Sequence, residues 1–221
     1  MVTVAGAAAG QSWPALAAPY TNGGTASEQP GARGAIALLS DTQFYSRYGV
    51  KSADLFARQY PGLPNPYDCQ TKWIVGHTAR YNIAMTHHLG DVCDQSGEGH
   101  EDQYVVANRA MKILDDAKAP YSVVPGNHDV ADDFRFYRKY FPRRRQAQSP
   151  SFREMGPSGL SNWHKFTVAG VPMMAHGANN VYESGRNLFE RRNDIEGPLR
   201  KGYQAVAKAM GNSEREGNIA Y

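Results

Sequence analysis

The sequence predicts an α/β protein whose first half alternates buried strands with helices. Three short apolar runs, at residues 35–41, 82–91 and 121–124, each stop abruptly at polar residues, as buried strands do on entering a loop. Two segments between them, residues 70–81 and 101–119, carry apolar residues at helical spacing. This alternation predicts a parallel sheet with helical crossovers and with both of its faces covered.

The second crossover has the clearer helical pattern. Its apolar positions recur largely at steps of three and four residues: Tyr104, Val106, Ala110, Ile113, Leu114 and Ala117. Glu101 and Asp102 place negative charge at its start, where the helix dipole favours it. A helix is therefore predicted to lead from the second strand to the third.

The second half of the chain has a different pattern. Residues 132–145 combine aromatic and basic side chains, and residues 146–162 have the composition of a loop. Residues 164–177 predict two strands about a turn at Ala169 and Gly170. One more helix is expected at residues 199–211.

Composition excludes several classes of protein. The 221 residues are 41% hydrophobic, which is enough for one sizeable core. A formal net charge of +3 is too small to indicate a nucleic-acid or membrane partner by itself. Two cysteines cannot form a disulfide framework or a four-cysteine zinc site. No apolar run reaches the roughly 18 residues that a membrane-spanning helix needs.

Residues 1–33 are expected to precede the folded domain, which we place at residues 34–221. They are rich in Ala and Gly and contain "ALA", which resembles a signal-peptidase site, but no basic segment comes before it. An export-signal remnant and a flexible leader both fit this pattern. Export and a cytoplasmic location therefore both stay open.

Ligand-type side chains follow all three predicted strands. Asp41 follows the first strand, Asp91 the second, and Asn127, His128 and Asp129 the third. Because parallel strands end at the same edge of a sheet, we expect these side chains to meet on one rim. Carboxylate, amide and imidazole groups are the ligands that hard or borderline divalent ions prefer.

The motifs around these residues resemble the first three motifs of the calcineurin-like metallophosphoesterase superfamily. They are "SDTQ" from Ser40, "GDVCD" from Gly90 and "PGNHD" from Pro125, in that order. The resemblance covers roughly residues 36–129 and extends loosely to the "FTVAGV" strand. It implies a four-layer α/β/β/α sandwich, of which this chain supplies the first sheet and part of the second.

The same resemblance implies a metal-dependent hydrolase of phosphomonoesters or phosphodiesters. Two divalent ions, such as manganese, iron or zinc, would be bound by Asp41 at the first site, by Asp91 as a bridge, and by Asn127 at the second site. His128 would act as general acid or stabilise the transition state, with Asp94 orienting it. Asn127 and His128 would also contact the substrate phosphate.

Two features depart from the superfamily pattern. Gln43 stands where most members have a histidine, although an amide oxygen can also coordinate a metal and a subset of members reads Asp-Thr-Gln. No Gly-His-x-His motif follows Asp129, where only His164 and His176 remain. We expect His164 to be a surface residue and His176, near the end of its strand, to be the better candidate ligand.

Other reactive side chains have ordinary structural interpretations. His87 and His88 point to opposite faces of a strand, and both are expected to pack or to support the site. Cys93 is expected to be a small buried residue. Asp129 is expected to support its turn.

The basic side chains of residues 132–145 are Arg135, Arg138, Lys139, Arg143, Arg144 and Arg145. Phe134, Tyr137 and Phe141 fall on one helical face, which favours an amphipathic helix over a nucleic-acid surface. Arg135 is the candidate to reach a substrate phosphate. The alternatives to an enzyme are a non-catalytic or truncated phosphoesterase-like module and a polyanion-binding protein.

Overall fold

A computed structural model describes residues 33–50, 58 and 63–177. The expected leader, apart from Arg33, and the helix expected at residues 199–211 lie outside this part of the chain. The elements, in chain order, are β1 (Ala35–Leu39), α1 (Gln43–Tyr48), α3 (Pro66–Tyr81), β2 (Ile83–His88), α4 (Glu101–Asp116), β3 (Tyr121–Val123), the 3-10 helix η2 (Asn127–Asp129), α5 (Ala131–Tyr140), α6 (Arg143–Gln146), β4 (Phe152–Met155), β5 (Asn162–Val168) and β6 (Val171–Gly177).

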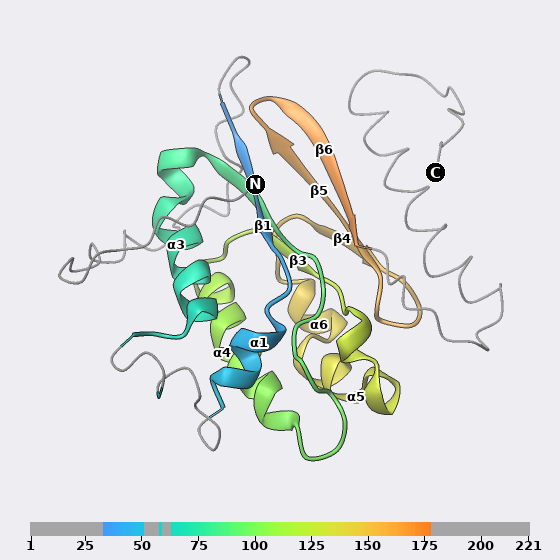
Figure 1. The fold of residues 1–221 in the computed structure, drawn as a ribbon. Helices are drawn as coiled ribbons and strands as arrows, with labels where there is room; N and C mark the ends of the chain where they lie inside the picture. Colours follow the sequence, from blue (N-terminus) through green and yellow to red (C-terminus); the bar gives the residue numbers. More distant parts are fainter. Residues whose placement is uncertain (1–32, 51–57, 59–62, 178–221) are drawn as a thin grey trace.

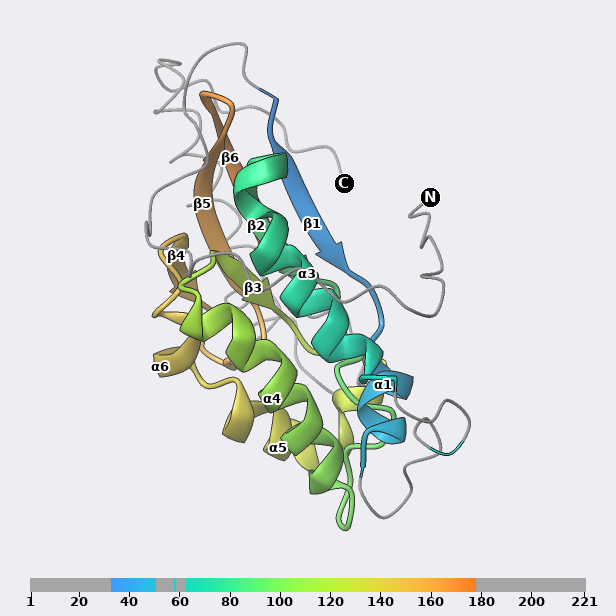
Figure 2. The same ribbon diagram turned by 90° about the vertical axis from the view of Figure 1, so that its left-hand side faces the viewer.

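The first three strands form a parallel sheet in the order β1-β2-β3, as the sequence predicted. Leu39 lies opposite His88, and His88 lies opposite Val123, so the three strands end side by side. Helices α3 and α4 pack against each other and cover one face of this sheet (Figures 1 and 2). The polar residues after each strand therefore lie on one edge.

Helix α3 begins earlier than its apolar pattern indicated. The side chain of Asn65 accepts a hydrogen bond from the amide of Tyr67 at 2.9 Å, and Pro66 occupies the first helical position. The helix ends at Tyr81, and the residue after it, Asn82, caps it with a left-handed φ of 53°. Capping chemistry, rather than the apolar residues, thus sets both ends.

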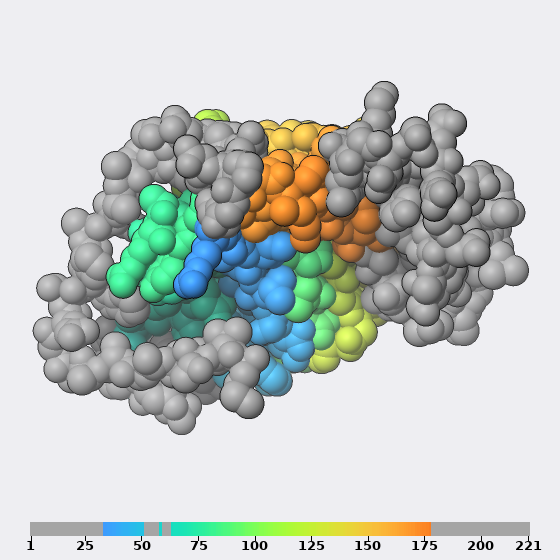
Figure 3. Space-filling model, turned by 90° about the horizontal axis from the view of Figure 1, so that it is seen from above, coloured from blue at the N-terminus to red at the C-terminus, as the bar shows by residue number. Residues whose placement is uncertain are grey.

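The other face of the parallel sheet is covered by a second, antiparallel sheet in the order β4-β5-β6. The side-chain Nδ2 of Asn162 donates to the carbonyl of Val123 at 2.7 Å, and Phe166 packs against Ala84 and Met85. Figure 3 shows the β5–β6 hairpin, in orange, lying along the blue residues of β1. The predicted hairpin is confirmed, and the described chain has a mixed α/β fold.

Two expectations for the second half were wrong. His164 is not on the surface: it is 0% exposed, and its Nδ1 lies 2.9 Å from the hydroxyl of Ser151. Alternation along β5 turns His164, like Phe166, toward the parallel sheet. The expected loop at residues 146–162 contains strand β4, because Phe152 to Met155 pair with β5.

The aromatic and basic segment forms α5 and, after Pro142, the short α6, so the predicted helix is confirmed in part: Asp132, Asp133 and Phe134 have left-handed φ values and the regular helix follows them. Phe134, Tyr137 and Phe141 are buried, and the hydroxyl of Tyr137 donates to the carbonyl of Val123 at 2.9 Å. This contact ties α5 to the third strand just before η2. No helix in the described part of the chain is both long and apolar enough to cross a membrane.

Candidate active site

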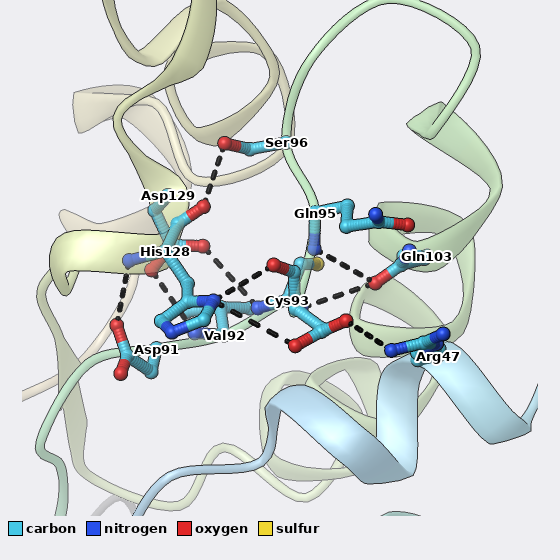
Figure 4. A network of polar contacts seen from close by, with 10 residues as sticks. Arg47, Asp91, Val92, Cys93, Gln95, Ser96, Gln103, His128 and Asp129 are labelled. Atoms are coloured by element: carbon cyan, nitrogen blue, oxygen red, sulfur yellow. Dashed lines mark hydrogen bonds and ion pairs between the residues drawn. The ribbon is translucent and has the colours of Figure 1, made fainter.

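Asp129 joins the ends of the second and third strands. Its carboxylate accepts hydrogen bonds from the amides of Val92 at 3.0 Å, Cys93 at 3.2 Å and Gly126 at 2.8 Å. The hydroxyl of Tyr104 donates to the same carboxylate at 2.7 Å. Figure 4 shows Asp129 beside the segment after β2 that carries Val92 and Cys93. The prediction that Asp129 supports its turn is confirmed, and Cys93 is buried as expected.

The charge of Asp129 is stabilised by these donors. Burial raises the pKa of this carboxyl to about 6, while its hydrogen bonds from Gly126, Tyr104, Val92 and Cys93 act to lower the pKa. Asp129 is therefore ionised at neutral pH. An ionised carboxylate offers only acceptors, which matches an environment made of four donors.

Two glycines let the strand ends approach each other closely. Gly90 has a φ of 109°, and a Cβ on Gly126 would lie 2.1 Å from Oδ1 of Asp91 and 2.3 Å from its backbone nitrogen. Asp91 itself has a left-handed φ of 48°. A left-handed conformation at a residue other than glycine costs about 1–3 kcal/mol, and residues that adopt it are concentrated at functional sites. The amide of His128 donates to Oδ1 of Asp91 at 2.9 Å, which fixes this carboxylate beside η2.

Replacing Gly126 with alanine is therefore expected to disrupt this edge of the sheet. The new Cβ would overlap backbone and carboxylate atoms of Asp91, so we expect Gly126→Ala to lower the free energy of unfolding by about 2 kcal/mol. Gly76→Ala is the control, because a Cβ added at this position inside α3 would have no neighbouring atom within 4 Å. That change is expected to stabilise the protein by about 1 kcal/mol. Urea unfolding of both variants checks the prediction, and equal effects would contradict it.

His128 is anchored through its ring and its backbone. Its Nδ1 donates to the main-chain carbonyl of Asp94 at 2.8 Å, while Oδ1 of the Asp94 carboxylate is 3.6 Å away. This bond raises the pKa of His128, and the charges of Asp91, Asp94 and Asp129 act in the same direction, against the effect of burial. The side chain is 37% exposed, so the ring is reachable from solvent.

Three residues that sequence reasoning missed hold the Asp94 loop, which follows β2, and the His128 turn in place. The side-chain oxygen of Gln103 accepts from the amide of Asp94 at 3.0 Å, and Ser96 donates to the carbonyl of His128 at 2.7 Å. Arg47 donates to Oδ2 of Asp94 at 2.8 Å. Figure 4 shows Arg47, Gln103 and Ser96 around His128, with these contacts as dashed lines. No local signal marks these residues, because each acts on a partner that is distant in sequence or outside its own element.

The first strand end is linked to the second through Thr42 and His88. The amide of Thr42 donates to the carbonyl of Asp91 at 3.2 Å, and the Thr42 hydroxyl donates to the carbonyl of Val92 at 3.2 Å. Nδ1 of His88 accepts from the amide of Gly90 at 3.2 Å, so Nε2 of His88 carries the proton that it donates to the Thr42 hydroxyl at 3.0 Å. His88 therefore supports the site from the core, as expected.

The predicted metal ligands lie at these strand ends. Asp41 and Asn127 are exposed, Asp91 is buried, and Gln43, which begins α1, is half-buried. The side-chain oxygen of Gln43 is buried and has no hydrogen-bond partner among the described residues. Within residues 33–50, 58 and 63–177, no three His, Cys, Asp or Glu side chains form a group that could hold a metal ion. The oxygen donors fit a hard cation in chemical type.

Two other predicted site residues lie away from this edge. His176 pairs with Trp163 in the β5–β6 ladder, so alternation places it on the face opposite to His164 and away from the parallel sheet. The guanidinium of Arg135 lies 4.8 Å from the ring centroid of Phe136 on α5. The roles assigned to His176 and Arg135 stay predictions.

Comparisons with known proteins give two matches. Residues 157–221 match a family described as "Protein of unknown function (DUF4225)". The chain is also 36% identical over 106 residues to the "Uncharacterized protein YvnB" of Bacillus subtilis (strain 168). That match covers 47% of this chain and 7% of the relative, so the chain corresponds to only a small part of the relative's length. No solved structure matches the chain.

Proposed function

We propose that this protein hydrolyses a phosphate ester at the edge formed by Asp41, Asp91 and Asn127, as a member of the calcineurin-like metallophosphoesterases. The observation that carries the proposal is the close packing of Gly90, Asp91 and Gly126, with His128 bonded to Asp91 through its amide at 2.9 Å. This packing places a carboxylate beside a reachable imidazole at the ends of parallel strands, which is where α/β proteins bind ligands.

The chain's own residues supply acid chemistry at this edge. Because Nδ1 of His128 donates to the carbonyl of Asp94, protonation of the ring adds its second proton at Nε2. The raised pKa of His128 increases the protonated fraction at neutral pH. A protonated Nε2 can donate to the oxygen of a leaving alcohol, which is the task of a general acid.

Metal ions complete the proposed site. Asp41 and Gln43 would hold one divalent ion, Asn127 would hold a second, and the carboxylate of Asp91, which the amide of His128 fixes in place, would be shared by both. When bound, such ions neutralise phosphate charge and lower the pKa of a bound water. Manganese, iron and zinc all accept these ligand types. The four-layer α/β/β/α sandwich is part of the same proposal, since the described residues form one helical layer and two sheets.

The polyanion-binding alternative receives less support from the contacts of α5 and α6. Lys139 pairs with Glu101, Arg138 with Asp133, and Arg145 with Asp115, so these cations already have acidic partners. Paired cations attract phosphates less strongly than a field of one sign does. We therefore favour hydrolysis over polyanion binding.

Hydrolysis of bis(p-nitrophenyl) phosphate in the presence of manganese tests the proposal. Asp91→Asn and Asn127→Ala are each expected to lower the rate by about 100-fold, the size of effect seen when one electrostatic group of an active site is removed. Asparagine suits position 91 because it tolerates the left-handed backbone and keeps an oxygen for the amide of His128. Removal of metal with EDTA is expected to abolish the reaction.

Asp116→Asn is the matched control for these variants. Asp116 is an exposed carboxylate that pairs with Lys112 in the last turn of α4, just before β3 begins at Tyr121, so it lies near the start of a strand and not at the strand ends. It is expected to keep full activity. If the wild-type protein shows no hydrolysis of mono- or diester substrates with manganese, iron or zinc, the proposed function is wrong.

A further inference from the structure

The carboxylate of Asp94 has two neighbouring donor groups, the guanidinium of Arg47 and the ring of His128, and only the first is in hydrogen-bond contact with it. Arg47 donates to Oδ2 at 2.8 Å, whereas Nδ1 of His128 lies 3.6 Å from Oδ1. The Asp94 side chain is 9% exposed, so water compensates little for a lost partner. Arg47 comes from α1 and reaches the loop after β2, as Figure 4 shows.

Nδ1 of His128 thus has a choice of acceptors. It donates to the neutral carbonyl of Asp94 at 2.8 Å, although an ionised carboxylate of the same residue is nearby. A charged acceptor forms a shorter and stronger hydrogen bond than a neutral one. A restraint on the carboxylate is therefore needed to keep the ring on the carbonyl, and the bond from Arg47 to Oδ2 supplies that restraint.

We propose that Arg47 is a positioning residue for His128: it holds the Asp94 carboxylate away from Nδ1, so that the ring stays anchored on the Asp94 carbonyl. The proposed role in hydrolysis rests on the function proposed above, but the contact itself does not. Without Arg47, the Asp94 carboxylate turns toward the ring and accepts the hydrogen bond from Nδ1 of His128 in place of the carbonyl. The ring then moves with the carboxylate, and the direction of Nε2 changes.

The proton on Nδ1 of His128 gives a direct test that needs neither metal nor substrate. Its NMR resonance, followed in protein labelled with ¹⁵N-histidine at one fixed pH, is expected to move downfield in Arg47→Met, because the acceptor becomes charged. Arg47→Lys keeps a cation and is expected to show a smaller shift. The double variant Arg47→Met/Asp94→Asn is expected to return the resonance close to its wild-type position, because an amide is neutral.

Arg109→Met is the matched control. Arg109 forms an ion pair of the same type with Asp68 at 2.9 Å, between α4 and α3 and outside the loop that carries Asp94. Its loss is expected to leave the His128 proton unmoved. An unmoved resonance in Arg47→Met, or an equal shift in Arg109→Met, would overturn the inference.

Kinetics separate this inference from the proposed function. In active protein, Arg47→Met is expected to lower kcat by about tenfold with KM unchanged, as loss of a supporting contact does when the substrate is still bound. A shifted resonance in a protein without any hydrolysis would refute the function and support the contact. Hydrolysis with an unchanged kcat in Arg47→Met would refute the positioning role and leave the function standing.

Discussion

Asp129→Asn is expected to lower the free energy of unfolding by about 3 kcal/mol, because it removes a buried charge from four hydrogen-bond donors. Three of these donors are backbone amides of Val92, Cys93 and Gly126. An asparagine side chain has one oxygen, and its NH₂ group would face donors instead of accepting from them. The folded protein loses stability because some of those amides stay buried without a hydrogen-bond acceptor.

Urea unfolding measures this loss, and a graded series isolates its cause. Tyr104→Phe removes one donor and keeps the carboxylate, so its cost is expected to be about 1 kcal/mol. Asp116→Asn changes an exposed carboxylate and is expected to cost less than about 0.5 kcal/mol. A loss in Asp129→Asn as small as that in Asp116→Asn would show that Asp129 does not hold the loops together.

Hydrogen exchange locates the damage. In Asp129→Asn, the amides of Val92, Cys93 and Gly126 are expected to exchange faster than in the wild-type protein, while amides inside α4 change less. The faster exchange would appear in both loops, because one carboxylate bridges them. Uniformly faster exchange would instead indicate a general loss of stability.

The parallel half of the fold was predictable because its signals are local. Each strand is a short apolar run with an abrupt polar end, and α4 has both periodicity and acidic residues at its start. Strand β4 was not predictable, because its four residues lie among Ser, Pro and Gly and are ordered by pairing with β5. Its structure depends on a partner strand rather than on its own pattern.

The site was predictable only where the motif itself forms the structure. Gly90, Asp91 and the residues of η2 are in contact, as their places after parallel strands indicated. The contact that anchors His128 was not predictable, since it is the carbonyl of Asp94, and not the expected carboxylate, that accepts from Nδ1. Main-chain groups are the same at every residue, so a sequence gives no sign of which carbonyl an imidazole will meet.

The burial of His164 illustrates the same limit and leads to the second large effect. A histidine at the start of a strand has no local feature that separates an inward from an outward position. Its burial depends on Ser151, whose hydroxyl meets Nδ1 at 2.9 Å and also lies 3.0 Å from the hydroxyl of Ser149. Nε2 of His164 is buried without a hydrogen-bond partner among the described residues. Such a ring is tolerated only while it is neutral.

None of the described groups that face His164 carries a negative charge that would stabilise an imidazolium. Burial lowers the pKa of His164 to about 3, and His87 on β2 and Arg153 on β4 act in the same direction. Phe152 presents its ring to His164 edge to face, and Ala175 on β6 and Ser151 are uncharged. Glu154 pairs with Trp163, which places it on the other face of the sheet. Among the residues that the structure describes, we therefore expect no acid on this face to stabilise an imidazolium.

Acid is consequently expected to destabilise the protein through His164. Because its folded pKa lies below the ordinary value of 6.5, protonation favours the unfolded chain, and stability is lost as pH falls from 6.5 toward 3. Between about pH 8 and about pH 5, His164 alone is expected to cost about 2 kcal/mol. His88, whose pKa burial also lowers to about 3, adds a loss of the same sign, while Asp129 with its raised pKa opposes both.

Comparison of the wild-type protein with His164→Gln isolates this contribution, because the other titrating groups are common to both. Glutamine is neutral at every pH and can still reach the hydroxyl of Ser151, so the variant is expected to lose about 2 kcal/mol less than the wild type between about pH 8 and about pH 5. His100→Gln, which changes a half-buried histidine just before α4, serves as control. Equal losses of unfolding free energy in the wild type and in His164→Gln would mean that the interior between the two sheets accepts a charged imidazole. The packing of neutral His164 against the parallel sheet would then contribute little to the acid sensitivity of the fold.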